Sequence, residues 1–374
     1  MPVVAFFPWL KIKEEIVVGN LRLSPYNIKL RKCCTQLEQD CNKVFSSYYI
    51  SSSKPIFELT VLSFKNKSMF EDITRKEMDQ LYLSSEFIAF SAISQREFFQ
   101  SYGNYCNKDD FMFYIQIFSK QFNGVFQRHR KRDGAIEKFT SLCDIKNIKP
   151  ENANCRYANI DKKILESLLK VQNSKNTDLF NEIFEAVYNF NRANTDNNYF
   201  NEAHEIVLLI GTIQRILGYN GHKDKELSKE FLKLFKPASD LDINQSNRLK
   251  NIQQCKNAKT LRQKWLEDLY HLRGDFAHGK LYSQKKCIWS SKEHLLLASY
   301  VFPLLVKCRL AKEGLYKLSD KDEYDKTGLY KLKKDDTFEV NVFEQLLDTD
   351  LFTPIKGKNG KENWPWLEII HDKK

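Results

Sequence analysis

The chain has 374 residues, of which 42% are hydrophobic, 13% aromatic and 29% charged, a balance typical of a soluble globular protein. No stretch approaches the roughly 18 uninterrupted apolar residues that a membrane span needs, and the N-terminus lacks the basic start of a signal peptide, so we expect a cytoplasmic protein. The net charge of +11 favours a polyanionic partner, because lysine and arginine gain affinity by displacing counterions from phosphates.

Residues 1–150 are predicted to form an N-terminal α+β or mainly β domain. Short β-like runs separated by Pro, Gly and Ser occur at Val3–Phe7, Glu15–Leu23, Ile56–Phe64 and Phe111–Phe118. Between them, Glu71–Tyr82 and Ser84–Phe99 have the composition of two helices, with Ser84 or Ser85 as the cap of the second. No pattern in this region assigns it a chemical function.

A basic run follows at residues 127–133, where four cations surround one histidine. The four cations are Arg128, Arg130, Lys131 and Arg132. They are candidates for guiding RNA electrostatically, and a solvated charge run at a domain junction is the other interpretation. Asp133 and Gly134 predict a turn, and we expect the domain boundary between residues 120 and 160.

From residue 161 onward the pattern changes to helical periodicity. The predicted helices are Asp161–Gln172, Asp178–Asn191, Tyr199–Leu217, Lys223–Phe235, Lys259–Ala277 and Lys292–Ala311. They define an all-α bundle over residues 155–315, so the whole chain is expected to be α+β. Residues 316–374 form a C-terminal extension, in which the repeated pentapeptide GLYKL at 314–318 and 328–332 predicts a hairpin or two short edge strands.

Several kinds of site are missing from the sequence. It contains neither GxGxxG nor GxxxxGK[ST], the glycine-rich fingerprints that cradle nucleotide phosphates. Its nine cysteines form no CxxC pair and have no histidine at zinc-ligand spacing, so we expect reduced thiols. We therefore expect no metal and no other cofactor.

The chemically informative segment is LRQKWLEDLYHLRGDFAHG at residues 261–279. As a helix it has one apolar stripe, formed by Trp265, Leu269, Leu272 and Phe276. Arg273 and His278 lie off this stripe and roughly 140° apart, so a regular helix does not bring them to one face. Either Gly274 and the residues after Ala277 distort the last turn, or another helix or subunit completes the site.

Arginine and histidine are a sensible minimum for cutting RNA without a metal ion. Histidine titrates near neutral pH and exchanges protons with hydroxyl groups, and arginine donates to phosphate oxygens through a permanently charged fork. Asp275 is a candidate for orienting either residue, and the alternative is an exposed acid paired with Lys280 or His271. Lys280 is also a candidate RNA contact. For His204 and Glu205, we favour a satisfied, partly buried polar pair over a contribution to the site.

The local form LY-x-x-R-G-D-F-A-H-G, with Arg273 and His278 separated by four residues, resembles the Arg-x4–6-His signature of HEPN domains, and especially their ApeA-like branch. The resemblance covers about residues 155–315 and implies a bundle of four or more helices. It also implies a metal-independent endoribonuclease that dimerises so that two Arg/His pairs face each other. In that assignment Arg273 binds the scissile phosphate and His278 activates the 2′-OH or supports phosphate positioning, which leaves 2′,3′-cyclic phosphate and 5′-hydroxyl ends.

The resemblance further implies a role in abortive-infection defence against phage. Residues 1–150 would then sense infection or restrain a toxic nuclease that cuts host or phage RNA, with tRNA as one candidate. The chain departs from the family pattern at Gly274, where a polar residue is frequent, and at Gln214, near where relatives often carry a glutamate. Two other functions stay open: an inactive HEPN module that binds RNA or a protein partner, and a structural domain in which Arg273 and His278 form a surface pair.

Overall fold

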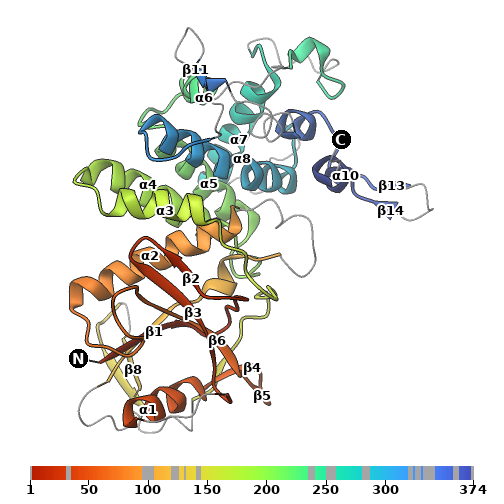
Figure 1. Cartoon of the computed structure of the whole chain (residues 1–374). Coiled ribbons are helices and arrows are strands. Elements are labelled where there is room, and N and C mark those ends of the chain that lie inside the picture. The colour runs from red at the N-terminus through yellow and green to blue at the C-terminus, as the bar shows by residue number, and fades with distance from the viewer. Residues whose placement is uncertain are drawn as a thin grey trace. The chain divides into compact units, whose positions relative to one another are not determined.

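The fold is mixed α+β, with an N-terminal sheet region followed by helices, which confirms the predicted class (Figure 1). The computed structural model describes residues 2–30, 35–94, 105–118, 126–129, 132–139, 145–234, 241–249, 258–279, 287–318, 323–324, 330–331, 342–356 and 362–371. The chain divides into two compact units, Met1–Glu166 and Ser167–Lys374. The division falls inside helix α3 (Lys162–Gln172).

The first unit is built on a five-stranded antiparallel sheet with the strand order β2-β3-β6-β1-β7. Its elements are β1 (Val3–Phe7), β2 (Ile16–Val18), β3 (Leu21–Asn27), β6 (Glu58–Phe64), β7 (Tyr114–Ile117) and the helices α1 (Gln36–Phe45) and α2 (Arg75–Ile93). Phe6 packs edge-on against Phe45 of α1, whereas Ala5, on the opposite face of β1, lies beside Leu81 of α2. Because both faces are covered, every residue of β1 is buried.

Shorter elements complete this unit. They are β4 (Tyr48–Ser51), β5 (Lys54–Pro55) and β10 (Asn147–Ile148), which form a three-stranded sheet, the 3-10 turn η2 (Lys108–Phe111), and the hairpin of β8 (Phe126–His129) with β9 (Ile136–Phe139). The predicted turn at Asp133 and Gly134 is confirmed, because Gly134 has a φ of 69° and the Asp133 carboxylate accepts from the Ala135 amide. Within the basic run, residues 127–129 therefore belong to strand β8, and Arg132 and Asp133 lie in the turn.

The prediction of two helices between residues 71 and 99 is wrong for the described part. One helix, α2, begins after Thr74, whose side chain and backbone exchange hydrogen bonds with Glu77 in a capping box. Ser84 and Ser85 are buried inside this helix and do not start a new one. The Ser85 hydroxyl donates to the Tyr82 carbonyl at 2.7 Å, so its hydrogen-bonding capacity is satisfied within the helix.

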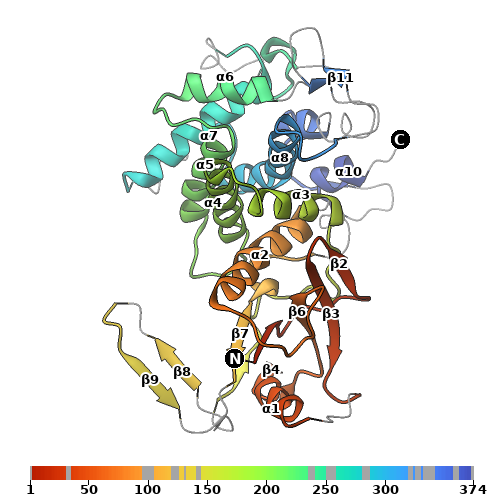
Figure 2. The same cartoon turned by 60° about the vertical axis from the view of Figure 1, so that its left-hand side comes forward.

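The helices that were predicted from the sequence are present in the second unit, apart from the start of α3, and each lies within three residues of the expected ends where it is described. They are α3 (Lys162–Gln172), α4 (Thr177–Ala193), α5 (Glu202–Ile216), α6 (Asp224–Leu234), α7 (Leu261–Ala277) and α8 (Ser291–Lys312). Helix α5 packs against α4, α7 and α8, and α6 lies on α7 (Figures 1 and 2). Helix α5 is therefore surrounded by three neighbouring helices.

Helix α8 is the described helix that is long and apolar enough to cross a membrane, but 72% of its apolar window is buried inside the protein. Its mean hydropathy over that window is 1.4. A buried helix of this kind is typical of the centre of a soluble protein.

Within the second unit, the C-terminal segment packs against the helices through residues 342–351, several of which are buried; Phe343, for example, packs edge-on against Trp265 of α7. Beyond it lie the pair β13 (Ile355–Lys356) and β14 (Glu362–Asn363) and the helix α10 (Pro365–His371). The expected hairpin is present as β11 (Glu323–Tyr324) and β12 (Tyr330–Lys331). Its β12 strand belongs to the second GLYKL sequence, whereas its partner strand comes from the acidic stretch before it and not from the first GLYKL sequence.

Candidate functional site

Helix α7 carries the motif and is regular to its end. Thr260 caps its first turn by accepting from the Gln263 amide, and the His278 amide still donates to the Gly274 carbonyl at 3.1 Å. Gly279 then adopts a φ of 75°, the left-handed conformation that ends helices. A distorted last turn does not bring Arg273 and His278 together, so the alternative in which another helix or chain completes the site remains.

Gly274 is not required by packing. A Cβ atom added there would meet no atom within 4 Å among the described residues, and its φ is not positive. We expect Gly274→Ala to raise the free energy of unfolding by about 0.5–1 kcal/mol, because alanine has the higher helix propensity. Denaturant titration of both proteins checks this value, and a variant less stable than the wild type would contradict it.

Arg273 is half-buried, and its Nε atom is shielded from solvent without a hydrogen-bond partner among the described residues. A buried N–H group without an acceptor is unfavourable, so such atoms call for an explanation. Phe276 follows three residues later and therefore lies on the same side of α7, roughly 60° around the helix. A ligand that contacts Phe276 from that side of α7 therefore also comes near Arg273.

His278 and Asp275 lie on a neighbouring side of α7, again roughly 60° apart. His278 is exposed at the C-cap, and Asp275 is half-buried rather than exposed. The negative charge of Asp275 also affects Cys287. Burial is the main cause that raises the pKa of the Cys287 thiol to about 12, and the charges of Asp268 and Asp275 contribute to it. His271, one of the two expected partners of Asp275, instead pairs with Asp224 at 3.0 Å.

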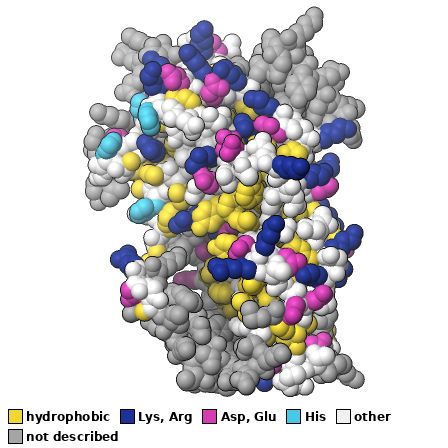
Figure 3. All heavy atoms as spheres, turned by 90° about the vertical axis from the view of Figure 1, so that its left-hand side faces the viewer, with side chains coloured by type: hydrophobic (Ala, Val, Ile, Leu, Met, Phe, Trp, Pro, Cys, Tyr) yellow, Lys and Arg dark blue, Asp and Glu magenta, His cyan; other side chains and the backbone are white. Residues whose placement is uncertain are grey.

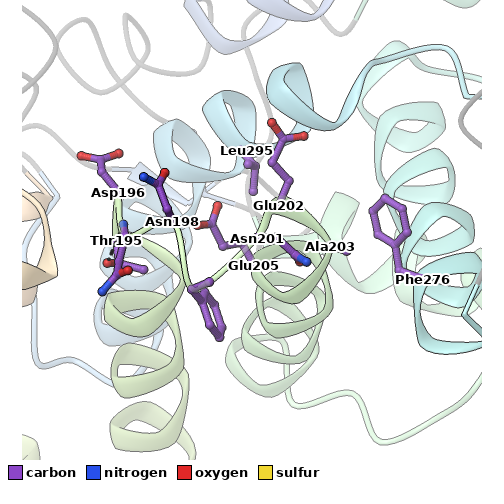
Figure 4. A pocket seen from close by; sticks show the side chains of 11 residues that line it. Thr195, Asp196, Asn198, Asn201, Glu202, Ala203, Glu205, Phe276 and Leu295 are labelled. Atoms are coloured by element: carbon purple, nitrogen blue, oxygen red, sulfur yellow. Dashed lines mark hydrogen bonds between the residues drawn. The ribbon is translucent and has the colours of Figure 1, made fainter. Parts of the chain in front are cut away.

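A cavity of about 630 Å³ opens beside the end of α7 (Figure 4). It is formed by the loop between α4 and α5, the first turns of α5 and α8, and Phe276 of α7. Its lining includes Thr195, Asp196, Asn198, Phe200, Asn201, Glu202, Ala203, Glu205, Phe276 and Leu295. Arg273 and His278 do not line it, so Phe276 is the part of the motif that reaches the cavity.

Glu205 is the buried acidic residue of this cavity, only 9% exposed, and its carboxyl group has no hydrogen-bond partner among the described residues. Burial, helped by the negative charges of Asp196 and Glu202, raises the pKa of Glu205 to about 8. The interpretation of His204 and Glu205 as a satisfied polar pair is wrong, because adjacent helix residues point apart: His204 is exposed and stacks on Phe200.

The raised pKa predicts a pH-dependent stability difference between the wild type and Glu205→Gln. Between pH 4.5 and about 8 the folded state holds a proton that the unfolded state has released, so the wild type loses stability as pH rises. The free energy of unfolding of the variant, relative to that of the wild type, should rise by at most about 1.4 kcal/mol per pH unit in this range. Above pH 8 this difference should stay constant. Urea unfolding from pH 5 to 9 measures the difference, and a difference independent of pH would contradict the prediction.

The predicted RNA-contacting cations are only partly described. Arg128 belongs to β8 and Arg132 is exposed in the following turn, whereas Arg130, Lys131 and Lys280 lie outside the described residues. On the side of the molecule that Figure 3 presents, the lysine and arginine side chains of the described residues are interspersed with acidic ones.

The lining of the cavity was not identified from the sequence, apart from Phe276, which was assigned to the core, and Glu205. The sequence feature that could have indicated this lining is a group of three acidic residues, Asp196, Glu202 and Glu205, at one loop between two predicted helices. Gln214, the expected position of a family glutamate, donates to the Gly221 carbonyl at 3.3 Å and so is held by the turn after α5. No group of three His, Cys, Asp or Glu side chains in the described ranges is arranged to hold a metal ion.

Comparisons with known proteins identify no relative. The chain matches no protein-family model, no curated protein and no solved structure.

Proposed function

We propose that this chain is a metal-independent endoribonuclease of the HEPN type, with Arg273 and His278 at its site. The observation that carries the proposal is Arg273, whose shielded Nε has no described acceptor and which shares a side of α7 with Phe276 of the cavity. A guanidinium group whose Nε donor has no described acceptor, on the side of a helix that faces a cavity, favours an anion as its ligand. An RNA phosphate provides that anion and agrees with the net charge of the chain.

In the proposed reaction, Arg273 donates to the non-bridging oxygens of the scissile phosphate and stabilises the charge that develops there. His278 takes the proton of the neighbouring 2′-OH, and the 2′-oxygen forms a bond to phosphorus. The bond from phosphorus to the 5′-oxygen breaks, and that oxygen takes up a proton. Asp275, three residues before His278 on α7, is proposed to orient the imidazole.

A homodimer is part of the proposal. On the regular helix α7 the two side chains diverge by roughly 140°, so a partner chain would bring a second Arg/His pair towards the first. The resemblance of the motif further supports a cytoplasmic role in abortive-infection defence, with a phage-derived trigger acting on residues 1–150 and RNA, including tRNA, as the substrate.

The experiment incubates the purified full-length wild type, Arg273→Ala and His278→Ala with total RNA in EDTA. We expect cleavage by the wild type and a loss of at least about 100-fold in each variant. The exposed His271 on the same helix supplies the matched control, His271→Ala, which should cleave as the wild type does. Cleavage that survives both Arg273→Ala and His278→Ala would reject this site, and wild-type cleavage that EDTA abolishes would reject metal independence.

The divergence of Arg273 and His278 also favours a second candidate function, a HEPN module that binds RNA or a protein partner without cutting it. A module of this kind needs only the donors of Arg273 and not a proton acceptor beside them. RNA that binds to the wild type and not to Arg273→Ala, with no cleavage by either protein, would select this function.

A further inference from the structure

The cavity beside Phe276 has the features of a binding site for a single flat polar group. Its volume of about 630 Å³ is within the usual range of small-ligand pockets, about 300–1,000 Å³. Phe200, Phe276 and Leu295 supply apolar surface, and Glu205, a residue that is nine-tenths buried, supplies a carboxyl group that has no described partner. A carboxyl group that faces a cavity of this size and has no described partner is available to hydrogen-bond to a ligand.

The charges of the lining decide which part of an RNA fits. Asp196, Glu202 and Glu205 are acidic, and their mutual repulsion is one cause of the raised pKa of Glu205. They would repel a phosphate, which Arg273 is better suited to bind. They accept hydrogen bonds from N–H groups, and the Watson–Crick edge of an unpaired base supplies those donors.

Guanine matches this set of acceptors best among the four bases. Its edge presents O6 as an acceptor and then N1–H and N2–H₂ as donors. A protonated carboxyl group pairs with O6 and N1–H, and an ionised one accepts from N1–H and N2–H₂, so Glu205 suits guanine in either protonation state. The N2 amino group leaves a further donor for the carboxylate of Glu202 or Asp196, and uracil offers no such donor.

We propose that this cavity holds one unpaired guanine of the RNA substrate and makes Glu205 a specificity-determining residue. The inference rests on the proposed ribonuclease function, because Arg273 would hold the adjoining phosphate while the base enters beside Phe276. The guanine ring stacks on the aromatic surface of the cavity, and its amino and imino groups satisfy the buried carboxyl group.

The experiment uses the full-length protein and fluorescent oligouridine RNAs that contain one central guanosine, inosine, adenosine, cytidine or no substitution. Binding is measured by anisotropy on 2′-deoxy versions, which cannot be cleaved by 2′-OH attack, and cleavage on the RNAs themselves, both in EDTA. We expect the guanosine RNA to bind about tenfold more tightly than the inosine and all-uridine RNAs, since both lack the N2 amino group, and one hydrogen bond from that group to a carboxylate of the cavity corresponds to about this factor.

Two variants of Glu205 separate recognition from folding. Glu205→Leu removes the polar group and should abolish the preference for guanosine, whereas Glu205→Gln, which keeps an acceptor and a donor, should retain most of it at pH 7. Glu230→Gln, at a solvent-accessible ion pair on α6, is the control and should bind as the wild type does. A guanosine preference that Glu205→Leu leaves intact would overturn the proposal.

The outcomes also separate this inference from the ribonuclease proposal. Cleavage that depends on Arg273 but ignores the base would overturn the guanine site and leave the ribonuclease standing. Guanosine-selective binding that Glu205→Leu abolishes, without cleavage, would support the guanine site and reject the ribonuclease. If spermidine displaces the oligonucleotides from the wild type but not from Glu205→Leu, without base preference, the cavity holds a cation and the proposal fails.

Discussion

Arg273→Ala is expected to reduce the rate of RNA cleavage by at least about 100-fold, because the variant loses the donors that neutralise the phosphate in the transition state. The folded state should tolerate the change, since the Arg273 Nε atom forms no hydrogen bond within the described residues. Single-turnover cleavage of a labelled RNA measures the rate, and urea unfolding of the same samples measures stability.

Arg273→Lys provides the sharper comparison. It keeps the positive charge and loses the planar fork, so it should recover RNA binding but only a small part of the rate. A lysine variant with the wild-type rate would show that charge alone suffices. An alanine variant with the wild-type rate would remove Arg273 from the site.

Arg248→Ala should have the largest effect on stability, a loss of about 3 kcal/mol. The guanidinium of Arg248 donates to both carboxylate oxygens of Glu293, at 2.7 and 2.9 Å, and to the carbonyls of Ile288 and Thr349. These bonds join the start of α8 to the C-terminal segment, and their loss leaves the carboxylate of Glu293 buried without its partner. The expected fall in Tm is roughly 6–12 °C for a unit of this size.

The matched control is Lys233→Ala, which breaks a solvent-accessible ion pair with Glu230 and should cost less than about 1 kcal/mol. Burial raises the pKa of Glu293, but hydrogen bonds from Arg248 and from the Ser290 amide outweigh it and hold that pKa below its ordinary value of 4.5. The stabilisation is therefore present above pH 4.5 and is lost as pH falls through the lowered pKa. Equal stabilities of the Arg248 and Lys233 variants would contradict this account.

The helices of the second unit were predictable because their apolar residues recur with helical spacing and their caps are local. Asn201 and Thr260 each accept from an amide three residues later, and Gly279 supplies the left-handed stop, so a short window of sequence contains the signal. The single helix α2 was missed because buried serines resemble caps. The Ser85 hydroxyl bonds back to the preceding turn, which depends on burial and not on sequence alone.

The candidate site was only partly predictable for a different reason. Arg273 and His278 stand in one recognisable segment, and their divergence follows directly from helix geometry. The cavity instead joins Phe276 to a loop about 75 residues earlier in the sequence, and only tertiary packing brings these together. The buried environment of Glu205 likewise arises from the packing of α5 against α4, α7 and α8.

The chemistry of the RNA ends tests the central claim most directly. Purified wild type is incubated with a labelled single-stranded RNA in EDTA, and the product ends are identified by mass spectrometry. The proposed function predicts 2′,3′-cyclic phosphate and 5′-hydroxyl ends that are absent with Arg273→Ala and with His278→Ala. Intact RNA, or products with 3′-hydroxyl and 5′-phosphate ends, would contradict it.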